Sequence, residues 1–526
     1  MKKTILLASL VASITTLAAT EGHVNYKFKG EINSTYDQAK KASTNEFKVP
    51  ETFVETEVKV KGSGLSFGGE FKAKDIKLGE AKAKNFLNHS KVFAKYELPE
   101  IKGVKSYVKA TVEPKFANED TKTAKKEPYK FDGSAELEGQ ASYKYDALTF
   151  GLNSKTNFPF AKKAVNYGED VKSTHKVFVE SEKDKDVFVK GLKDVKANVE
   201  IKHDYRKLEK QNPKAAKAVD YVKGEVSAKY DAIKDFAVEG KAGFKVNVSK
   251  FLVSNGDYFK EDKDGHDVIL GGVKLNHYLD KFDGTDWIRK VTGLHREYAN
   301  VKLTYTGVKG LTLSANPFVD YTEGYRKYDN KHKVVENAHL IMFGTSLDAK
   351  YVLLNDKLTL TGNVLLSGVR DVKTNTTKTI KNRGVYVAKL GAKYDYAVNS
   401  KLTVSPEFTV SSAVLTDDYL ANNKAGFVTL KPEVNAVYKA TDKLELKGGL
   451  SLSANFDKIK KNNNKLVGTK ELELKPSASL VYKPVEGLEV NNKVELPVKF
   501  DEKADKSLKY KGLDVKTELN IKYSWK

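Results

Sequence analysis

The segment Lys443–Phe456, KLELKGGLSLSANF, alternates between apolar and polar positions along its whole length. Every second residue from Leu444 is apolar or glycine, and the residues between them are charged, polar or glycine. Successive side chains of a β-strand point to opposite faces, so the segment predicts a strand with one apolar and one polar face. Strands of globular proteins are typically about 5–6 residues long. A strand of 10–15 residues, at ~3.3 Å per residue and a tilt near 45°, spans roughly the apolar band of an outer membrane.

The same alternation returns along the chain from His23 to the C-terminus. Further segments that show it are 24–32, 129–145, 236–248, 488–500 and 513–525. In the last of them Leu519, Ile521, Tyr523 and Trp525 lie on the apolar face. The chain therefore predicts one repeated kind of strand.

The connections between these strands alternate in length. Ten are short turns, as in TYTGVKGLTL and YVLLNDKLTL, and eleven are longer polar segments, which predicts 22 strands with both termini on the short-turn side. The longer segments are 37–46, 79–87, 116–127, 161–174, 206–216, 251–297, 323–337, 372–382, 416–425, 457–466 and 501–510. Segment 177–190 alternates poorly, and 266–278 could form a strand pair but is assigned to a loop. The expected range is therefore 16–24 strands.

These features predict an all-β fold: a single transmembrane antiparallel up-and-down β-barrel of about 22 strands over residues 20–526. Its short turns would be periplasmic and its long loops extracellular. A closed barrel leaves no backbone hydrogen-bonding group unpaired in lipid, and its apolar face meets lipid while its polar face meets a water-filled interior. Tyrosines recur at the short-turn ends of the strands, as in an interfacial aromatic girdle. They are Tyr145, Tyr230, Tyr305, Tyr396, Tyr438 and Tyr482.

Residues 1–19 have the features of a Sec-type signal peptide. Lys2 and Lys3 precede the apolar run 4–14, and small residues follow near Ala18 and Ala19. Nothing after them approaches the ~18–20 apolar residues of a membrane helix. We therefore expect an exported protein, integral to the cell outer membrane.

Composition and motifs argue against several other functions. The chain has no cysteine, which excludes disulfides, thiol catalysis and a lipoprotein anchor. The formal net charge is +22, but the lysines are spread along the chain and only six of the 91 basic residues are arginine, so nucleic acid is not an expected partner. No H-E-x-x-H, G-x-S-x-G or Walker A motif is present. We expect no enzyme activity, no cofactor and no metal.

The signal sequence, the strands over nearly all of 23–526 and the terminal apolar strand together resemble the Gram-negative outer-membrane β-barrel proteins, porins in particular. No narrower subfamily is identified. The resemblance implies a channel for passive diffusion of small hydrophilic solutes and ions. Its implied partners are outer-membrane lipid, the solutes or ions themselves and the outer-membrane assembly machinery, and a homo-oligomer is left open.

The long segment 251–297 is the most unusual part of the chain. By the resemblance we expect it to fold into the barrel and set a pore constriction, against the alternative of a surface-exposed loop. Arg289 and Arg296 would then oppose Asp262 and Asp264 and create a transverse field. The acidic stretch around Gly265 could hold Ca²⁺, but a solvated acidic loop is the preferred interpretation because the spacing is not that of an EF-hand.

The polar faces of the strands supply candidate lining residues for the interior. These are Lys130, Glu136, Glu138, Lys144, Lys443, Glu445 and Lys447. Their signs are mixed, with a lysine surplus along the chain, so a weak anion preference is the hypothesis. The alternative is that interior charges balance locally and the surplus lies on outer loops, near anionic head groups.

Three other functions remain as alternatives to a passive channel. A surface adhesin or antigen would use the barrel as a scaffold for its external loops, and would have a filled interior. An outer-membrane hydrolase would need a Ser or Asp with a His at the outer rim, and no such set is recognisable. A soluble periplasmic β protein would be extracted without detergent. Energy-coupled transport is disfavoured because alternation begins within a few residues of the signal sequence, with no plug-like stretch.

Overall fold

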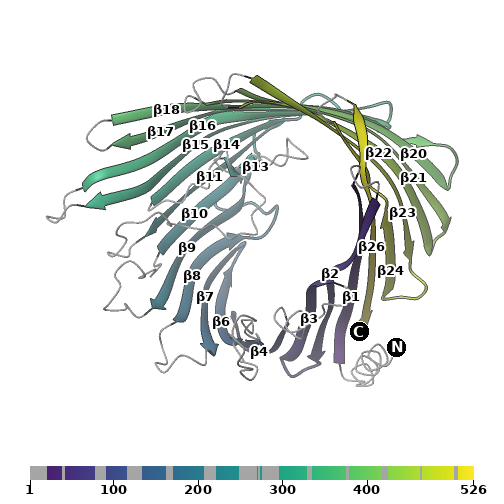
Figure 1. Cartoon of the computed structure of the whole chain (residues 1–526). Helices are drawn as coiled ribbons and strands as arrows, with labels where there is room; N and C mark the ends of the chain where they lie inside the picture. The colour runs from purple at the N-terminus through teal and green to yellow at the C-terminus, as the bar shows by residue number, and fades with distance from the viewer. Residues whose placement is uncertain are drawn as a thin grey trace, which may run out of the picture.

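The computed structural model describes residues 20–37, 42–77, 90–114, 133–160, 170–206, 221–247, 269–270, 273–274, 295–328, 334–374, 378–417, 424–461, 465–502 and 507–525. Within these residues, 22 strands form one closed antiparallel β-barrel (Figure 1). Each barrel strand pairs with its neighbours in chain order. β1 (Thr20–Asp37) closes the ring by pairing with β26 (Leu508–Trp525). The predicted all-β up-and-down barrel of about 22 strands is confirmed.

The first half of the barrel runs from β1 to β14. Its strands are β2 (Ala42–Val60), β3 (Leu65–Lys77), β4 (Lys91–Ile101), β5 (Val104–Glu113), β6 (Gly133–Tyr145), β7 (Leu148–Phe160), β8 (Asp170–Ser181), β9 (Leu192–Arg206), β10 (Tyr221–Tyr230), β11 (Phe236–Asn247) and β14 (His295–Tyr305).

The second half runs from β15 to β26. Its strands before β26 are β15 (Leu311–Tyr328), β16 (Val334–Leu353), β17 (Leu358–Thr374), β18 (Lys378–Tyr394), β19 (Tyr396–Ala397), β20 (Leu402–Asp417), β21 (Lys424–Thr441), β22 (Leu444–Lys461), β23 (Lys465–Tyr482), β24 (Leu488–Glu495) and β25 (Val498–Glu502).

Two barrel strands are interrupted, and one hairpin lies apart. β18 and β19 both pair with β20, so they form one strand of the barrel. β24 and β25 both pair with β23 and β26, and the break between them includes Pro497, whose nitrogen has no hydrogen to donate to the sheet. β12 (Ile269–Leu270) and β13 (Val273–Lys274) pair only with each other. They lie in the segment 266–278 that was assigned to a loop.

The ten predicted short turns are confirmed, and all of them lie in described residues. They are 61–64, 102–103, 146–147, 182–191, 231–235, 306–310, 354–357, 398–401, 442–443 and 483–487. Several need a glycine, as at Gly310 and Gly487, where φ is +78°. A Cβ there would lie 2.3 Å from the carbonyl oxygen of Val352 at Gly310 and 2.2 Å from that of Ser524 at Gly487. Only glycine fits such a position without strain.

The predicted limits of several long loops are wrong, because the strands extend further than the alternation does. Segment 323–337 holds the end of β15 and the start of β16, and segment 372–382 holds parts of β17 and β18. Beyond the apolar band of a membrane both faces of a strand meet water. A strand there needs no alternation, so the sequence pattern fades before the strand ends.

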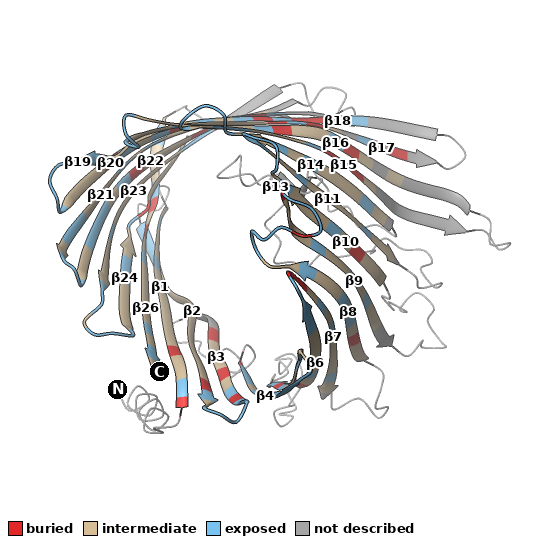
Figure 2. Ribbon diagram, turned by 180° about the vertical axis from the view of Figure 1, so that it is seen from behind, coloured by how far each residue is buried: buried red, intermediate tan, exposed pale blue. Residues whose placement is uncertain are grey.

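Exposure is inverted relative to a soluble protein. On β22 the side chain of Leu450 is 50% exposed, whereas Ser451 beside it, on the opposite face, is 6% exposed. Buried residues are scattered along the strands and form no central core (Figure 2). Many large apolar side chains therefore have no protein covering them, as expected for a surface that meets lipid.

Five of the six predicted girdle tyrosines have exposed side chains at the short-turn ends of their strands: Tyr145, Tyr230, Tyr396, Tyr438 and Tyr482. The sixth, Tyr305, packs its ring 4.8 Å from that of Phe236. Among the residues that the structure describes, no helix is long and apolar enough to cross a membrane.

Candidate functional site

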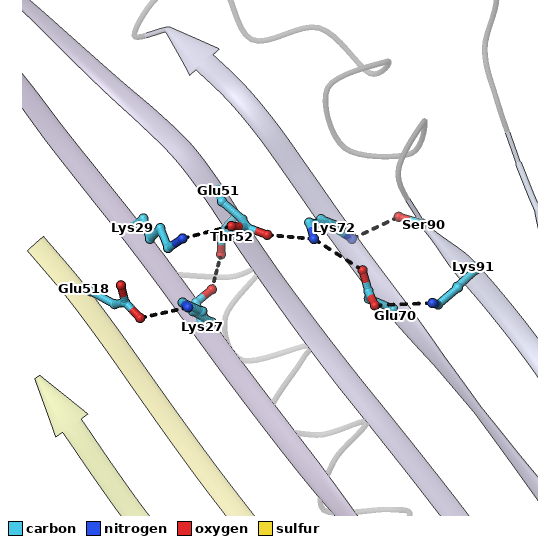
Figure 3. A network of polar contacts seen from close by, with 9 residues as sticks. All are labelled: Lys27, Lys29, Glu51, Thr52, Glu70, Lys72, Ser90, Lys91 and Glu518. Atoms are coloured by element: carbon cyan, nitrogen blue, oxygen red, sulfur yellow. Dashed lines mark hydrogen bonds and ion pairs between the residues drawn. The ribbon is translucent and has the colours of Figure 1, made fainter. Parts of the chain in front are cut away.

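The inner face of the barrel carries a ladder of alternating charges across five neighbouring strands, β26, β1, β2, β3 and β4 (Figure 3). We call it the charge ladder, and its members are Glu518, Lys27, Lys29, Glu51, Lys72, Glu70 and Lys91.

The ladder forms because each strand turns every second side chain inward and adjacent strands lie about 4.8 Å apart. Lys72 bridges two carboxylates, with its Nζ 2.7 Å from Glu51 and 3.6 Å from Glu70. Lys29 reaches the other oxygen of Glu51 at 3.2 Å, and Lys27 lies 2.8 Å from Glu518. Cation and anion alternate, so this part of the wall is close to neutral.

The ladder continues into a recess of about 270 Å³ between β1, β24 and β26. Lys516 of β26 lies 3.4 Å from Glu31 of β1. Lys493 and Glu495, which are both on β24, lie 2.7 Å apart. These residues extend the polar wall without adding a strong excess of either sign.

Two of the predicted lining residues, Glu136 and Glu138, lie on β6 and belong to a second polar cluster. Lys155 of β7 lies 3.0 Å from Glu136 and 3.5 Å from Glu138. The Tyr107 hydroxyl and the Asn153 amide each donate a 2.9 Å hydrogen bond to Glu138. The three partners come from the neighbouring strands β5 and β7, and strand pairing was needed to find them.

The other described candidates lie near the short turns. Lys144 and Lys185 both contact Glu182, in the turn 182–191, and their hydrogen bonds hold the pKa of that carboxyl below its usual range. Lys443 Nζ donates to the Pro484 carbonyl at 2.9 Å.

Glu445 and Lys447 form a 2.8 Å ion pair near the start of β22. Lys130 lies outside the described residues. The described candidates therefore lie in two places, the wall of β6 and the short-turn rim.

The four predicted constriction residues are not brought together by the described structure. Asp262, Asp264 and Arg289 lie outside the described residues. Arg296 lies on β14 instead of in a loop, and its guanidinium binds Asp320 of β15 through Nε at 3.1 Å and through an Nη atom at 2.6 Å. Asp320 is fully buried.

Two further inward side chains accompany this pair. The Tyr298 hydroxyl donates a 2.5 Å hydrogen bond to Glu225 of β10, and Lys241 of β11 lies 2.9 Å from the same carboxylate. The Arg296 guanidinium lies 5.4 Å from the centre of the Tyr298 ring. Alternation within HREYANVKLTY would have placed Arg296 and Tyr298 on one strand face.

Lysines lie over aromatic rings at several points of the inner wall. Lys109 Nζ is 4.4 Å from the centre of the Phe93 ring, and Lys245 Nζ is 4.7 Å from that of Tyr221. Such contacts are worth about 0.5–1 kcal/mol at exposed sites, enough to hold a long side chain against the wall. The sequence pattern alone did not single out these rings.

Inward charges are unevenly distributed around the described part of the barrel. On β8–β14 the inward positions given by the strand registers carry more basic than acidic residues. The basic ones are Lys172, Lys176, Lys193, Lys196, Lys202, Arg206, Lys223, Lys229, Lys241, Lys245, Arg296 and Lys302, and the acidic ones are Asp170, Glu180, Glu200, Asp204, Glu225 and Glu239.

On β20–β26 the inward positions carry acidic and basic residues in nearly equal numbers. The acidic ones include Glu407, Glu433, Glu445, Glu471, Glu473, Glu489, Glu495, Asp501, Asp514 and Glu518, and the basic ones include Lys431, Lys439, Lys447, Lys461, Lys465, Lys475, Lys493, Lys499, Lys516 and Lys522. Figure 1 shows β7–β11 on one side of the barrel and β20–β26 on the other. We call the inward faces of β8–β14 the basic wall.

The inner face is not polar throughout. Leu365 of β17 and Ala413 of β20 face inward and are fully buried, Val387 of β18 is buried between them, and Phe318 of β15 is buried on the same face. Strand pairing places Leu365 opposite Val387, and Val387 opposite Ala413. These neighbouring apolar side chains exclude water from this part of the inner face.

Comparisons with known proteins give structural likenesses only. No protein-family model and no curated protein sequence matches this chain. Among solved structures, a mutant of the ferric enterobactin receptor PfeA from Pseudomonas aeruginosa shares 8% identity over 96% of this chain and 81% of its own, with a TM-score of 0.49. The FrpB iron transporter from Neisseria meningitidis shares 10% identity over 97% of this chain and 82% of its own, with a TM-score of 0.47. The outer membrane protein OpdK from Pseudomonas aeruginosa shares 8% identity over 96% of this chain and 99% of its own, with a TM-score of 0.34.

The barrel itself indicates its class. Closing the sheet satisfies the backbone of every pair of neighbouring strands without leaving an edge, and the apolar side chains that point outward have no protein to cover them. Short turns gather at one end of the barrel. A chain built in this way is suited to lie in lipid, and it has the fold of the outer-membrane β-barrel proteins.

Proposed function

We propose that the protein is an outer-membrane channel for the passive diffusion of small hydrophilic solutes and ions, with no catalytic role. The observation that carries the proposal is the inner wall of charged and hydrogen-bonding side chains, which includes the charge ladder and the basic wall. Such side chains are stable inside a barrel when water reaches them, because burying a charge away from water is costly. A barrel lined in this way offers a polar path across lipid.

The basic wall supports a weak preference for anions. Rings or clusters of one sign bias which ion enters a pore. The charge ladder is nearly balanced and adds little, so the preference rests on the lysines of β8–β14. The inward charges of β20–β26 nearly balance and add nothing to it, and the carboxylates on the basic wall itself keep the preference weak.

The test is the conductance of folded protein in a planar lipid bilayer under a KCl gradient. We expect discrete current steps. We also expect a reversal potential whose sign shows that chloride is more permeant than potassium. Folding is checked beforehand by the change in gel mobility on heating, with heat-unfolded protein as the control. Silence from folded protein would contradict the channel. It would favour the alternative of a surface adhesin or antigen, whose binding segments would lie in external loops outside the described residues.

A further inference from the structure

The outer face of β8–β14, which points toward lipid, contains a cavity. A cavity of about 620 Å³ lies over adjacent small residues, Ala197 of β9, Gly224 of β10 and Ala242 of β11. The registers bring these three together: Val226 lies opposite both Ala197 and Ala242, and Gly224 is opposite Phe244. We call this cavity the outer hollow.

An ionisable side chain lies on each side of the outer hollow. His175 of β8 faces outward on one side, where its Nδ1 lies 2.9 Å from the Ser154 hydroxyl of β7. Glu297 of β14 lines the hollow on the other side and is exposed. Its outward direction follows from its neighbours on the strand, since Arg296 and Tyr298 make inward contacts.

Charged residues are costly on a lipid-facing surface. A lysine, arginine, aspartate or glutamate that faces lipid near the membrane midplane destabilises a barrel. Ionisable residues within a membrane-spanning region usually face protein or water and mark functional contacts. A hollow with an acid at one edge and a base at the other is therefore better suited to protein than to acyl chains.

We propose that the outer hollow is the centre of an interface with a second copy of this chain. Two copies in one membrane share their orientation, so a twofold axis relating them is normal to the membrane. If that axis passes through the hollow near β10, β8 of one copy faces β14 of the other. Glu297 then meets His175 of the partner subunit, and the contact occurs twice. One chain carries both His175 and Glu297, and a self-complementary surface requires both members of each contacting pair on the same chain.

The depths of the two residues fit this arrangement. His175 lies six residues from the short-turn end of β8 at Ser181, and Glu297 lies eight residues from that of β14 at Tyr305. The two side chains are therefore at similar heights in the membrane. Val177 and Val226, both strongly exposed at the hollow, supply the apolar surface that the partner covers.

A neighbouring cavity shows what a lipid-filled site would look like. It measures about 450 Å³ and lies over Ala315, Ala349 and Gly362 of β15–β17. The one charged residue among its described lining residues, Asp348, accepts a 2.8 Å hydrogen bond from the inward amide of Asn363. This cavity has apolar walls and no charge aimed outward, so it serves as the matched control.

The test is cysteine cross-linking in native membranes. Because the chain has no cysteine of its own, only the introduced cysteines can react. In the variant carrying both His175→Cys and Glu297→Cys, a short bis-maleimide should give a product of twice the chain's mass. Each single variant expressed alone should give little cross-linked dimer. Co-expression of the two single variants should give the dimer. A variant with Leu303→Cys and Gly362→Cys, placed across the control cavity, should remain monomeric.

Three outcomes would overturn the interface. They are full labelling of the double variant without dimer formation, cross-linking of either single variant to itself as strongly as in the double variant, and a product with the mass of a different protein. A second variant separates interface from folding: Ala242→Trp fills the outer hollow and should cut cross-linking at least fivefold in barrels that still show heat-dependent gel mobility. Ala349→Trp in the control cavity should leave it unchanged. Full cross-linking in the Ala242→Trp background would also refute the proposal, whether or not the barrel conducts.

Discussion

Replacing Lys202, Lys223 and Lys245 together by glutamate reverses the ion preference of the channel from anions to cations. The three lysines face inward from β9, β10 and β11, with Lys223 directly opposite Lys245 and Lys202 opposite Tyr221. The replacement changes the charge of the basic wall by six units. At about 10 Å in water this alters the energy of a monovalent ion by about 2.5 kcal/mol before screening. About a third of it survives at 0.1 M salt, so the permeability ratio should change at least about fourfold.

The measurement is the reversal potential under a KCl gradient, compared with a variant of equal net charge. Lys234, Lys309 and Lys401 lie exposed in three of the short turns, and their replacement by glutamate removes the same charge from outside the inner wall. That control should shift the reversal potential by far less. Equal shifts in the two variants would mean that the total charge of the protein, and not the basic wall, sets the preference.

Replacing Arg296 by methionine costs about 3–5 kcal/mol of unfolding free energy, because a buried carboxylate loses its partner. Asp320 is 0% exposed, and Arg296 is its bidentate partner. The loss is measured by urea unfolding from lipid vesicles. Adding Asp320→Asn to Arg296→Met should recover much of the stability, since the remaining side chain is no longer charged.

The matched control is Lys447→Met. Lys447 and Glu445 form an ion pair whose side chains are 46% and 29% exposed, so water replaces the lost contact. Exposed pairs contribute about 0.2–1 kcal/mol, and this variant should lose no more than that. Similar losses in the two variants would show that Asp320 is not buried as the structure has it.

The strand number could be predicted from the sequence because turns are encoded locally. A turn such as the one around Gly310 is specified by a few adjacent residues, and each of the ten was recognisable. The strand ends were harder to predict. Residues 372–382 are mostly polar, with only Val372 and Ile380 apolar, yet they form parts of β17 and β18, since outside lipid nothing requires alternation.

The contacts of the inner wall could be predicted only in part. Alternation marks Glu138 as inward, but its partner Tyr107 is 31 residues away and is found only when the register of β5 and β6 is known. Arg296 was assigned to the long loop because its neighbours before residue 295 read as loop, and its partner is Asp320 on the next strand. The register of two paired strands depends on the tertiary structure. It cannot be predicted from the alternation of polar and apolar residues along the sequence.

The apolar patch on the inner face was also beyond the sequence. Alternation over 358–366 places Leu366 on the outer face with Leu360 and Val364, but it gives no reason for an apolar residue at Leu365 on the inner face. In the structure Leu365 faces inward and is fully buried, while Leu366 is 43% exposed on the outer face. The apolar partners of Leu365 are Val387 and Ala413 on the next two strands of the barrel, and they are found only when the strand registers are known.

The central claim is that the barrel turns an apolar face to lipid and a polar face to water. A cysteine scan of positions 445–453 in membranes tests it most directly, since the chain has no cysteine of its own. A charged, water-soluble maleimide should label Glu445→Cys, Lys447→Cys, Gly449→Cys and Ser453→Cys. Cysteines at Leu446, Gly448, Leu450 and Leu452 should react only with a maleimide dissolved in the bilayer. If the charged reagent labelled both sets, or left the first set unlabelled, the lipid-facing exterior or the water-filled interior would be contradicted.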